Sequence, residues 1–247
     1  MKIESFVLSD VGRMRSENQD SSGYFADRNL FVVADGMGGH KGGKQASELA
    51  VAVVEETFSA PAAGPADFER ALGMLVEAVR EANRRIVERA ASDSELHRMG
   101  TTLVALLIDA PASGAIVHVG DSRAYRLRDG QLELLTSDHT IVNDLLRNNE
   151  ISEAEASRHP YRHVLTRALG ADAEVAPDVQ RIEIRPEDLY VICSDGVSGM
   201  LTPAEIRDVL VSYRDNPEAA CRELIDAANR AGGRDNATAV AIRCAPD

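Results

Sequence analysis

The chain has 247 residues, of which 44% are hydrophobic and 27% are charged, a balance typical of a globular protein with a sizeable core. Its formal net charge of −13 argues against binding to nucleic acid or to an anionic membrane, because both would repel it. Three widely spaced cysteines argue against a disulfide framework and a cysteine-based zinc site. No signal peptide and no apolar run of ~20 residues is present, so we expect a cytoplasmic protein.

Short apolar or alternating runs predict strands along most of the chain. They are Ile3–Leu8, Ser21–Phe25, Leu30–Ala34, Thr102–Ile108, Ala115–Val119, Ala124–Arg128, Leu132–Leu135, Leu189–Cys193 and Thr238–Ile242. Between two of these strands, Asp129-Gly130 predicts a hairpin turn.

Helical spacing of apolar residues predicts two long helices, at about 44–58 and 68–91, separated by a loop rich in Ala, Pro and Gly. Capping patterns predict three more helices, which begin after Ser152, Thr202 and Asn216. Antiparallel strands with helices grouped in the sequence favour a layered α+β domain over a doubly wound parallel sheet.

Aspartates stand at the ends of several predicted strands. Asp35 and Asp195 each follow a buried apolar run, Asp121 follows another, and Asp20 and Asp235 stand just before strands. Carboxylates placed against a core are costly, and several together repel one another. A divalent cation relieves both problems, and hard oxygen ligands favour Mg²⁺ or Mn²⁺ over Zn²⁺.

A simpler interpretation is that these aspartates form turns, because Asp-Gly is a common turn dipeptide. Asp129-Gly130 provides an internal comparison, since its flanks are short and polar and predict only a turn. From spacing alone, the carboxylate metal site and the set of turns both remain open.

Seven motifs occur in order along nearly the whole chain. They are Ser9-Asp10-Val11-Gly12-Arg13-Met14-Arg15-Ser16-Glu17-Asn18-Gln19-Asp20, Val33-Ala34-Asp35-Gly36-Met37-Gly38-Gly39-His40, Met99-Gly100-Thr101-Thr102, Val119-Gly120-Asp121-Ser122-Arg123, Leu165-Thr166-Arg167-Ala168-Leu169-Gly170, Cys193-Ser194-Asp195-Gly196 and Arg234-Asp235-Asn236-Ala237-Thr238. Together they resemble the bacterial branch of the type 2C (PPM) metal-dependent protein serine/threonine phosphatases.

The resemblance implies an α+β fold, a four-layer αββα sandwich in which helices flank two antiparallel sheets packed face to face. It implies a single catalytic domain over residues 1–247, with a flap over the site at about 138–177. It also implies hydrolysis of phosphoserine and phosphothreonine by a hydroxide bridging two divalent metals, with two or three Mn²⁺ or Mg²⁺ ions as cofactors.

The same resemblance implies particular metal ligands. They are Asp20, Asp35, Gly36, Asp121, Asp195 and Asp235. Asp35 would bridge two cations, and Asp20 would act through water. Asp121, with Asp195, would hold a third cation.

Arg15 would bind the substrate phosphate through its planar fork, the alternative being a surface salt bridge. Animal members carry a histidine directly after the Asp-Gly, often proposed as the general acid, and Met37 fills that place here. His40, three residues later, is therefore the candidate general acid, and otherwise it is a loop histidine. Gln19 stands where many members have Glu. We read His97, His118 and His139 as structural or surface residues.

The resemblance also implies phosphorylated proteins as partners, among them bacterial Ser/Thr kinases and their targets, and we expect a monomer that binds neither nucleic acid nor a membrane. One alternative is a degenerate, non-catalytic phosphatase fold, but a scaffold would not need to keep the metal aspartates. A second is a two-metal nuclease, which the acidic composition and the lack of a basic stripe disfavour.

Overall fold

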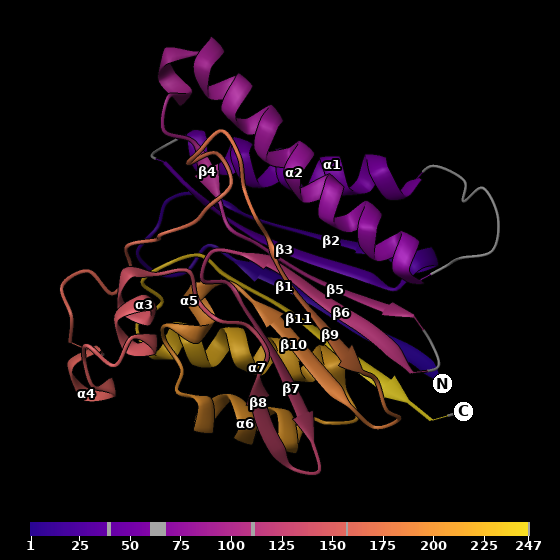
Figure 1. Ribbon diagram of the computed structural model, residues 1–247. Coiled ribbons are helices and arrows are strands. Elements are labelled where there is room, and N and C mark those ends of the chain that lie inside the picture. Colours follow the sequence, from indigo (N-terminus) through magenta and orange to yellow (C-terminus); the bar gives the residue numbers. More distant parts are fainter. Residues whose placement is uncertain (39–40, 60–67, 110–111, 157, 247) are drawn as a thin grey trace.

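Alternation along the central strands explains how the layers stack. In β3 (Leu30–Met37), Leu30 and Val32 pack into the core beneath helices, whereas Phe31 and Val33 pack into the core between two sheets. The computed structural model, which describes residues 1–38, 41–59, 68–109, 112–156 and 158–246, is accordingly a sandwich of two sheets with helices on both outer faces (Figure 1).

Each sheet is antiparallel wherever the described strands pair. The first has the order β1 (Lys2–Asp10), β11 (Ala237–Ala245), β10 (Leu189–Cys193), β7 (Arg123–Arg128) and β8 (Gln131–Leu134). The second has the order β2 (Asp20–Phe25), β3, β5 (Leu103–Asp109), β6 (Ser113–Val119) and β9 (Asp178–Glu183), with β4 (Gly100–Thr101) paired to β3. The predicted four-layer α+β sandwich is confirmed.

Two amphipathic helices cover each outer face. On the second sheet lie α1 (Gly42–Ser59) and α2 (Phe68–Ser92), and on the first lie α6 (Pro203–Ser212) and α7 (Pro217–Arg230) (Figure 1). The predicted caps are present, because Thr202 and Glu205 form a capping box and the Asn216 side chain accepts a hydrogen bond from Ala219.

The sequence patterns missed four short elements. They are β4, β9, α3 (Ile141–Arg147) and α5 (Asp195–Ser198). Strand β9 lies at the edge of its sheet with mostly exposed side chains, so it lacks the apolar alternation of a half-buried strand. Helix α5 is a single turn that starts at Asp195, directly after β10.

Between β8 and β9 the chain leaves the sandwich. This segment carries α3 and α4 (Glu153–Ala156), which project at the end of the molecule away from both termini (Figure 1). The short helix predicted after Ser152 is α4. Two 3₁₀ turns, Ala26–Arg28 and Ser94–Leu96, complete the elements of the described residues. Within those residues, no helix has the combined length and apolarity that crossing a membrane requires.

Candidate metal centre

Strand pairing places the first two aspartates opposite each other. Asp20 begins β2 and is in register with Asp35 near the end of β3, so their Cα atoms lie about 4.5–5.5 Å apart, as in any antiparallel pair. The backbone of Asp35 is fixed by two threonines. Its carbonyl accepts from Thr102 N (2.9 Å) and Thr101 Oγ1 (2.8 Å), and its N–H donates to Thr102 Oγ1 (3.0 Å). The Met99–Thr102 motif is therefore a backbone clamp on Asp35.

Asp195 and Asp235 meet through a close approach of two loops. Ser194 precedes α5, and Asp195 is its first residue. A Cβ on Gly196 would lie 1.8 Å from the carbonyl oxygen of Asn236, so only glycine allows this approach. The glycine of this Asp-Gly pair is required because it packs backbone against backbone beside the acids.

Five carboxylates, those of Asp20, Asp35, Asp121, Asp195 and Asp235, act on one another in this region. Burial, followed by repulsion from the other four aspartates, raises the pKa of Asp35 well above its usual range. Burial and neighbouring acids likewise raise the pKa of Asp20 to about 6 and that of Asp121 to about 7. All five residues are of intermediate exposure and none is fully buried, so an ion can approach them from solvent.

Asp20 shows that the chain leaves part of this charge without a partner. Its Oδ2 accepts from Ser194 Oγ (2.7 Å) and Thr238 Oγ1 (2.6 Å), whereas its buried Oδ1 has no hydrogen-bond partner in the described residues. An orphaned carboxylate oxygen among mutually repelling acids suits a hard divalent cation. The residues of this site therefore fit the cations implied by the sequence.

Arg15 reaches the same place from the loop between β1 and β2. Its Nη2 donates to Asp235 Oδ2 at 2.6 Å. Asn236 fastens this loop, because its Nδ2 donates to the carbonyls of Val11 and Glu17 (both 2.9 Å) and its Oδ1 accepts from Gln19 N (2.8 Å).

The structure thus brings Arg15 and all five predicted aspartates together. Gly36 lies next to Asp35, and its N–H donates to the Gln19 carbonyl at 3.2 Å. His40 lies outside the described residues. Burial and the charge of Asp235 raise the pKa of Asp195, and His163, from the segment after α4, opposes this rise, so this segment lies near the acids.

Sequence reasoning missed the residues that support the acids, namely Asn236, Ser194 and Thr238. A signal was present, because all three sit inside motifs that also carry an aspartate. Their importance depends on hydrogen bonds to distant parts of the chain, which spacing does not reveal.

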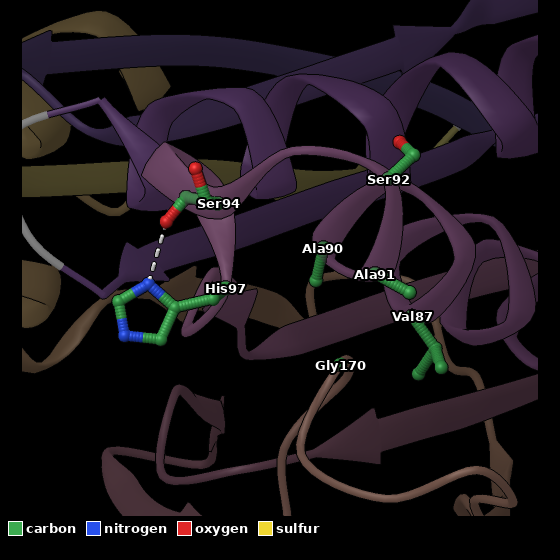
Figure 2. Close-up of a pocket in the computed structure, with 7 residues that line it drawn as sticks. All are labelled: Val87, Ala90, Ala91, Ser92, Ser94, His97 and Gly170. Atoms are coloured by element: carbon green, nitrogen blue, oxygen red, sulfur yellow. Dashed lines mark hydrogen bonds between the residues drawn. The ribbon is translucent and has the colours of Figure 1, made fainter.

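A separate surface hollow lies beside the end of α2 (Figure 2). It is lined by Val87, Ala90, Ala91, Ser92, Ser94, His97 and Gly170. His97 Nδ1 there pairs with its own local backbone, at 2.8 Å from the Ser94 carbonyl. None of the described residues that line this hollow is a carboxylate, so they offer none of the chemistry of the acid cluster.

Comparison with known proteins gives consistent matches. The family described as Protein phosphatase 2C matches residues 13–229. The serine/threonine phosphatase stp of Listeria welshimeri is 38% identical over 237 residues, which cover 95% of this chain and 93% of the relative. The serine/threonine protein phosphatase PstP of Mycobacterium tuberculosis is 39% identical over 234 residues, 94% of this chain and 43% of that protein.

Solved structures agree over the full length. The Mycobacterium tuberculosis serine/threonine phosphatase PstP/Ppp superposes with a TM-score of 0.89 at 36% identity, covering 99% of both chains. The catalytic domain of the serine threonine protein phosphatase PstP in complex with two manganese ions gives a TM-score of 0.86 at 35% identity, again over 99% of both chains.

Proposed function

The chain belongs to the protein phosphatase 2C family and is a metal-dependent protein serine/threonine phosphatase, and we propose that the clustered aspartates are its metal ligands. The family and fold expected from the seven motifs are confirmed. One observation carries the proposal: Asp20, Asp121, Asp195 and Asp235 lie close enough to the buried Asp35 that, beyond the effect of burial, their charges raise its pKa.

The aspartates divide the work of holding Mn²⁺ or Mg²⁺. In the proposal Asp35, in register with Asp20 and close to Asp195, would be shared by two cations, with the Gly36 carbonyl as a further ligand. Asp195 and Asp235 would complete the first site, Asp20 would act through water, and Asp121 would hold a third cation. When bound, such cations lower the pKa of a water molecule and neutralise phosphate charge.

Arg15 supplies the chain's own cation for the substrate. Its guanidinium is planar and permanently charged, and it is half exposed beside Asp235, so it can take two phosphate oxygens without leaving the acid cluster. It holds the phosphate in line for attack by water. Its contribution is to position the substrate and not to transfer a proton. For the proton needed by the departing serine or threonine oxygen, His40 remains our candidate.

We also propose the biological setting. The substrates are phosphorylated proteins, and we propose bacterial Ser/Thr kinases and their targets among them. The chain would act as a cytoplasmic monomer with one catalytic domain over residues 1–247. The segment at 138–177 would be its flap, because its helices project from the sandwich (Figure 1) and its His163 lies near Asp195.

Phosphatase assays test this function directly. With Mn²⁺, the protein should release phosphate from a phosphothreonine peptide much faster than from the matched phosphotyrosine peptide, and EDTA should abolish the reaction. Excess Mn²⁺ added after EDTA should restore it, which separates metal removal from denaturation. Phosphate release that persists in EDTA would contradict the proposed function.

A further inference from the structure

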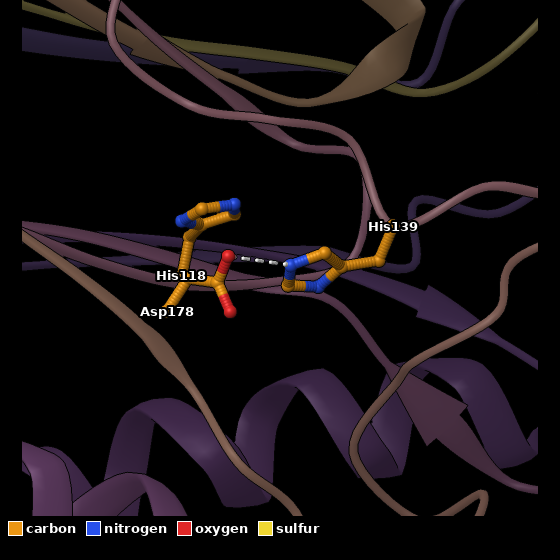
Figure 3. A group of neighbouring side chains, drawn as sticks. All are labelled: His118, His139 and Asp178. Carbon is orange, nitrogen blue, oxygen red and sulfur yellow. Dashed lines mark ion pairs between the residues drawn. The ribbon is translucent and has the colours of Figure 1, made fainter. Parts of the chain in front are cut away.

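Two buried histidines and one aspartate form a polar cluster apart from the five acids (Figure 3). His118 lies on β6, His139 precedes α3, and Asp178 begins β9. His139 Nδ1 accepts the N–H of Gly120 at 3.0 Å, so in the neutral ring Nε2 carries the proton, and neither nitrogen has a lone pair free for a metal. Asp178 accepts from Arg167 Nη1 at 2.6 Å, so its charge is balanced within the chain. We therefore assign this cluster to the fold rather than to a ligand.

A second polar network joins β1 to the end of α7. Asp10 is the last residue of β1, and its Oδ1 accepts two hydrogen bonds, from Gly12 N at 2.8 Å and from Asn229 Nδ2 at 3.0 Å. The first bond closes an Asx turn, in which an aspartate side chain fixes the backbone two residues later. The second ties that turn to α7, because Asn229 lies in the last turn of this helix. Two elements therefore hold the start of the loop between β1 and β2.

The Asx turn sets this loop directly against an acid of the metal centre. Gly12 has a φ of 80°, and a Cβ there would lie 2.2 Å from the carbonyl oxygen of Asp235, so the loop rests on the Asp235 backbone. The N–H groups of the next two residues donate to the Gly233 carbonyl, at 2.7 and 3.2 Å. Arg15 follows, and its Nη2 reaches Asp235 Oδ2 at 2.6 Å. The chain is thus fixed from the Asx turn to the guanidinium.

Stability alone explains Asn229 poorly. Its side chain belongs to a residue that is 8% exposed, and its Oδ1 has no hydrogen-bond partner in the described part of the chain. A buried oxygen without a partner costs stability, and an apolar side chain would avoid that cost. The amide is explained by its other end, because Nδ2 is the group that reaches Asp10.

Arg15 depends on this backbone for its position. Its side chain is 54% exposed, so packing does little to hold it. A guanidinium fork must meet phosphate oxygens at hydrogen-bond distance, and a shift of about 1 Å in such a positioning group is costly. A fixed loop therefore favours phosphate binding more than the arginine side chain could by itself.

We propose that Asp10 and Asn229 are positioning residues, which fix the Asx turn at Gly12 and thereby hold the Arg15 guanidinium where it meets the substrate phosphate. The inference rests on the proposed function, in which Arg15 binds that phosphate. Among the described residues, the hydrogen bonds of the Asp10 side chain go to Gly12 and Asn229 and not to the five acids. Its loss should therefore weaken the binding of phosphate rather than the binding of metal.

Two variants of Asp10 separate hydrogen bonding from charge. Both hydrogen bonds go to the same oxygen, so Asp10→Asn can keep them while it removes the charge, and Asp10→Ala loses both. With Mn²⁺ and a phosphothreonine peptide, Asp10→Ala should raise KM about fivefold and lower kcat by less, whereas Asp10→Asn should stay within about twofold of the parent. Asn229→Ala, which loses one of the two bonds, should lie between them. Inhibition by inorganic phosphate should weaken in the same order.

A double-mutant cycle tests whether the effect passes through Arg15. The KM of Asp10→Ala/Arg15→Ala should equal that of Arg15→Ala within about twofold, because a positioning residue then has nothing left to position. An independent structural effect would instead multiply the two increases in KM. Calorimetric titration of Mn²⁺ supplies a readout without catalysis, and Asp10→Ala should bind Mn²⁺ as tightly as the parent does.

The possible failures are distinguishable. A folded Asp10→Ala with the parent's KM, beside an Arg15→Ala whose KM rises, would overturn the inference and leave the role of Arg15 standing. An unchanged KM in Arg15→Ala would overturn that part of the proposed function and the inference with it. Multiplied effects in the double variant, or weaker Mn²⁺ binding that accounts for the loss in Asp10→Ala, would also overturn the inference. If circular dichroism shows that Asp10→Ala does not fold, Asn229→Ala replaces it in every comparison.

Discussion

Asp188 and Asp35 are two carboxylates that the fold removes from water in opposite ways. Asp188 is 1% exposed, and it accepts hydrogen bonds from Arg128 Nε (2.7 Å), Arg128 Nη2 (2.6 Å), Arg185 N (2.8 Å) and the Tyr190 hydroxyl (2.9 Å). At Asp35, burial and then the charges of the surrounding aspartates raise the pKa.

The difference separates structural charge from functional charge. The chain itself satisfies Asp188, so that carboxylate needs nothing from solution. Around Asp35 the fold concentrates negative charge, and among the described residues Arg15 pairs with Asp235 at its edge. A buried pair contributes little beyond a hydrophobic replacement, whereas an uncompensated cluster is costly until a cation binds. The acid cluster therefore lowers the stability of the metal-free protein, and the same acids provide the ligands for metal-dependent chemistry.

The same small substitution, Asp to Asn, should have its largest effect at Asp35. Asp35→Asn removes a charged ligand of the cations that activate water, so kcat/KM for an aryl phosphate with Mn²⁺ should fall at least about 100-fold. In EDTA the variant should melt no lower than the parent, because a repelling charge is gone. Steady-state kinetics measure the change in kcat/KM, and thermal melts in EDTA measure the change in stability. Unaltered turnover would contradict the metal-ligand assignment.

At Asp188 the substitution should reverse this pattern. Asp188→Asn leaves the half-buried Arg128 without its nearest charge partner, which should lower the free energy of unfolding by about 3 kcal/mol. Because no substrate contact is lost, kcat/KM of the folded fraction should stay near the parent value. Urea denaturation measures the loss. Asp215→Asn is the matched control, since Asp215 pairs with Arg243 but is 71% exposed and should cost at most about 1 kcal/mol.

The pH dependence of the metal-free protein provides a third test. The pKa values of Asp20 (about 6) and Asp121 (about 7) lie above their ordinary value in the unfolded chain. Their contribution to stability is therefore fully present below about pH 4 and is lost as the pH rises through about 6 to 7. In EDTA, an Asp20→Asn/Asp121→Asn variant should match the parent at pH 4 and exceed its melting temperature at pH 8.

Mn²⁺ supplies the control for this pH test. When Mn²⁺ is present the parent should gain melting temperature at pH 8, and the double variant should gain less. Identical slopes of melting temperature against pH for parent and variant in EDTA would show that the two acids do not carry the raised pKa values.

Arg15 combines features of both carboxylate environments, because it is an arginine in an ion pair, as at Asp188, and its partner belongs to the acid cluster. If it holds the substrate phosphate in the ground state, Arg15→Ala should raise KM for a phosphothreonine peptide about tenfold and lower kcat less. Arg13→Ala is the matched control, because Arg13 lies two residues earlier in the same loop. A phosphopeptide KM unchanged in Arg15→Ala would remove Arg15 from the site.

Much of this site could be predicted from the sequence because its acids sit at strand ends. An apolar run that stops at Asp35 or Asp195 predicts both a buried strand and a carboxylate placed at its end. His139 could not be predicted in the same way. Its Nδ1 accepts from the N–H of Gly120 and its Nε2 lies 3.4 Å from Asp178 Oδ2, and only folding brings these residues together. Strand β9 was missed for a related reason, since its place is fixed by pairing with β6 rather than by its own apolar pattern.

Asp129 should show the smallest effect of the same Asp to Asn change. Its Asp-Gly pair turns the β7–β8 hairpin, with φ of 51° at Asp129 and 75° at Gly130, and a Cβ on Gly130 would meet nothing within 4 Å. Asparagine tolerates this left-handed conformation as well as aspartate does, so Asp129→Asn should change stability by less than about 0.5 kcal/mol and leave kcat/KM unchanged. Urea denaturation and the aryl phosphate assay measure both quantities. Asp35 follows a buried strand, whereas Asp129 lies in an exposed turn. A large loss of stability or of kcat/KM in Asp129→Asn would mean that burial does not explain which Asp-Gly pairs of this chain are important.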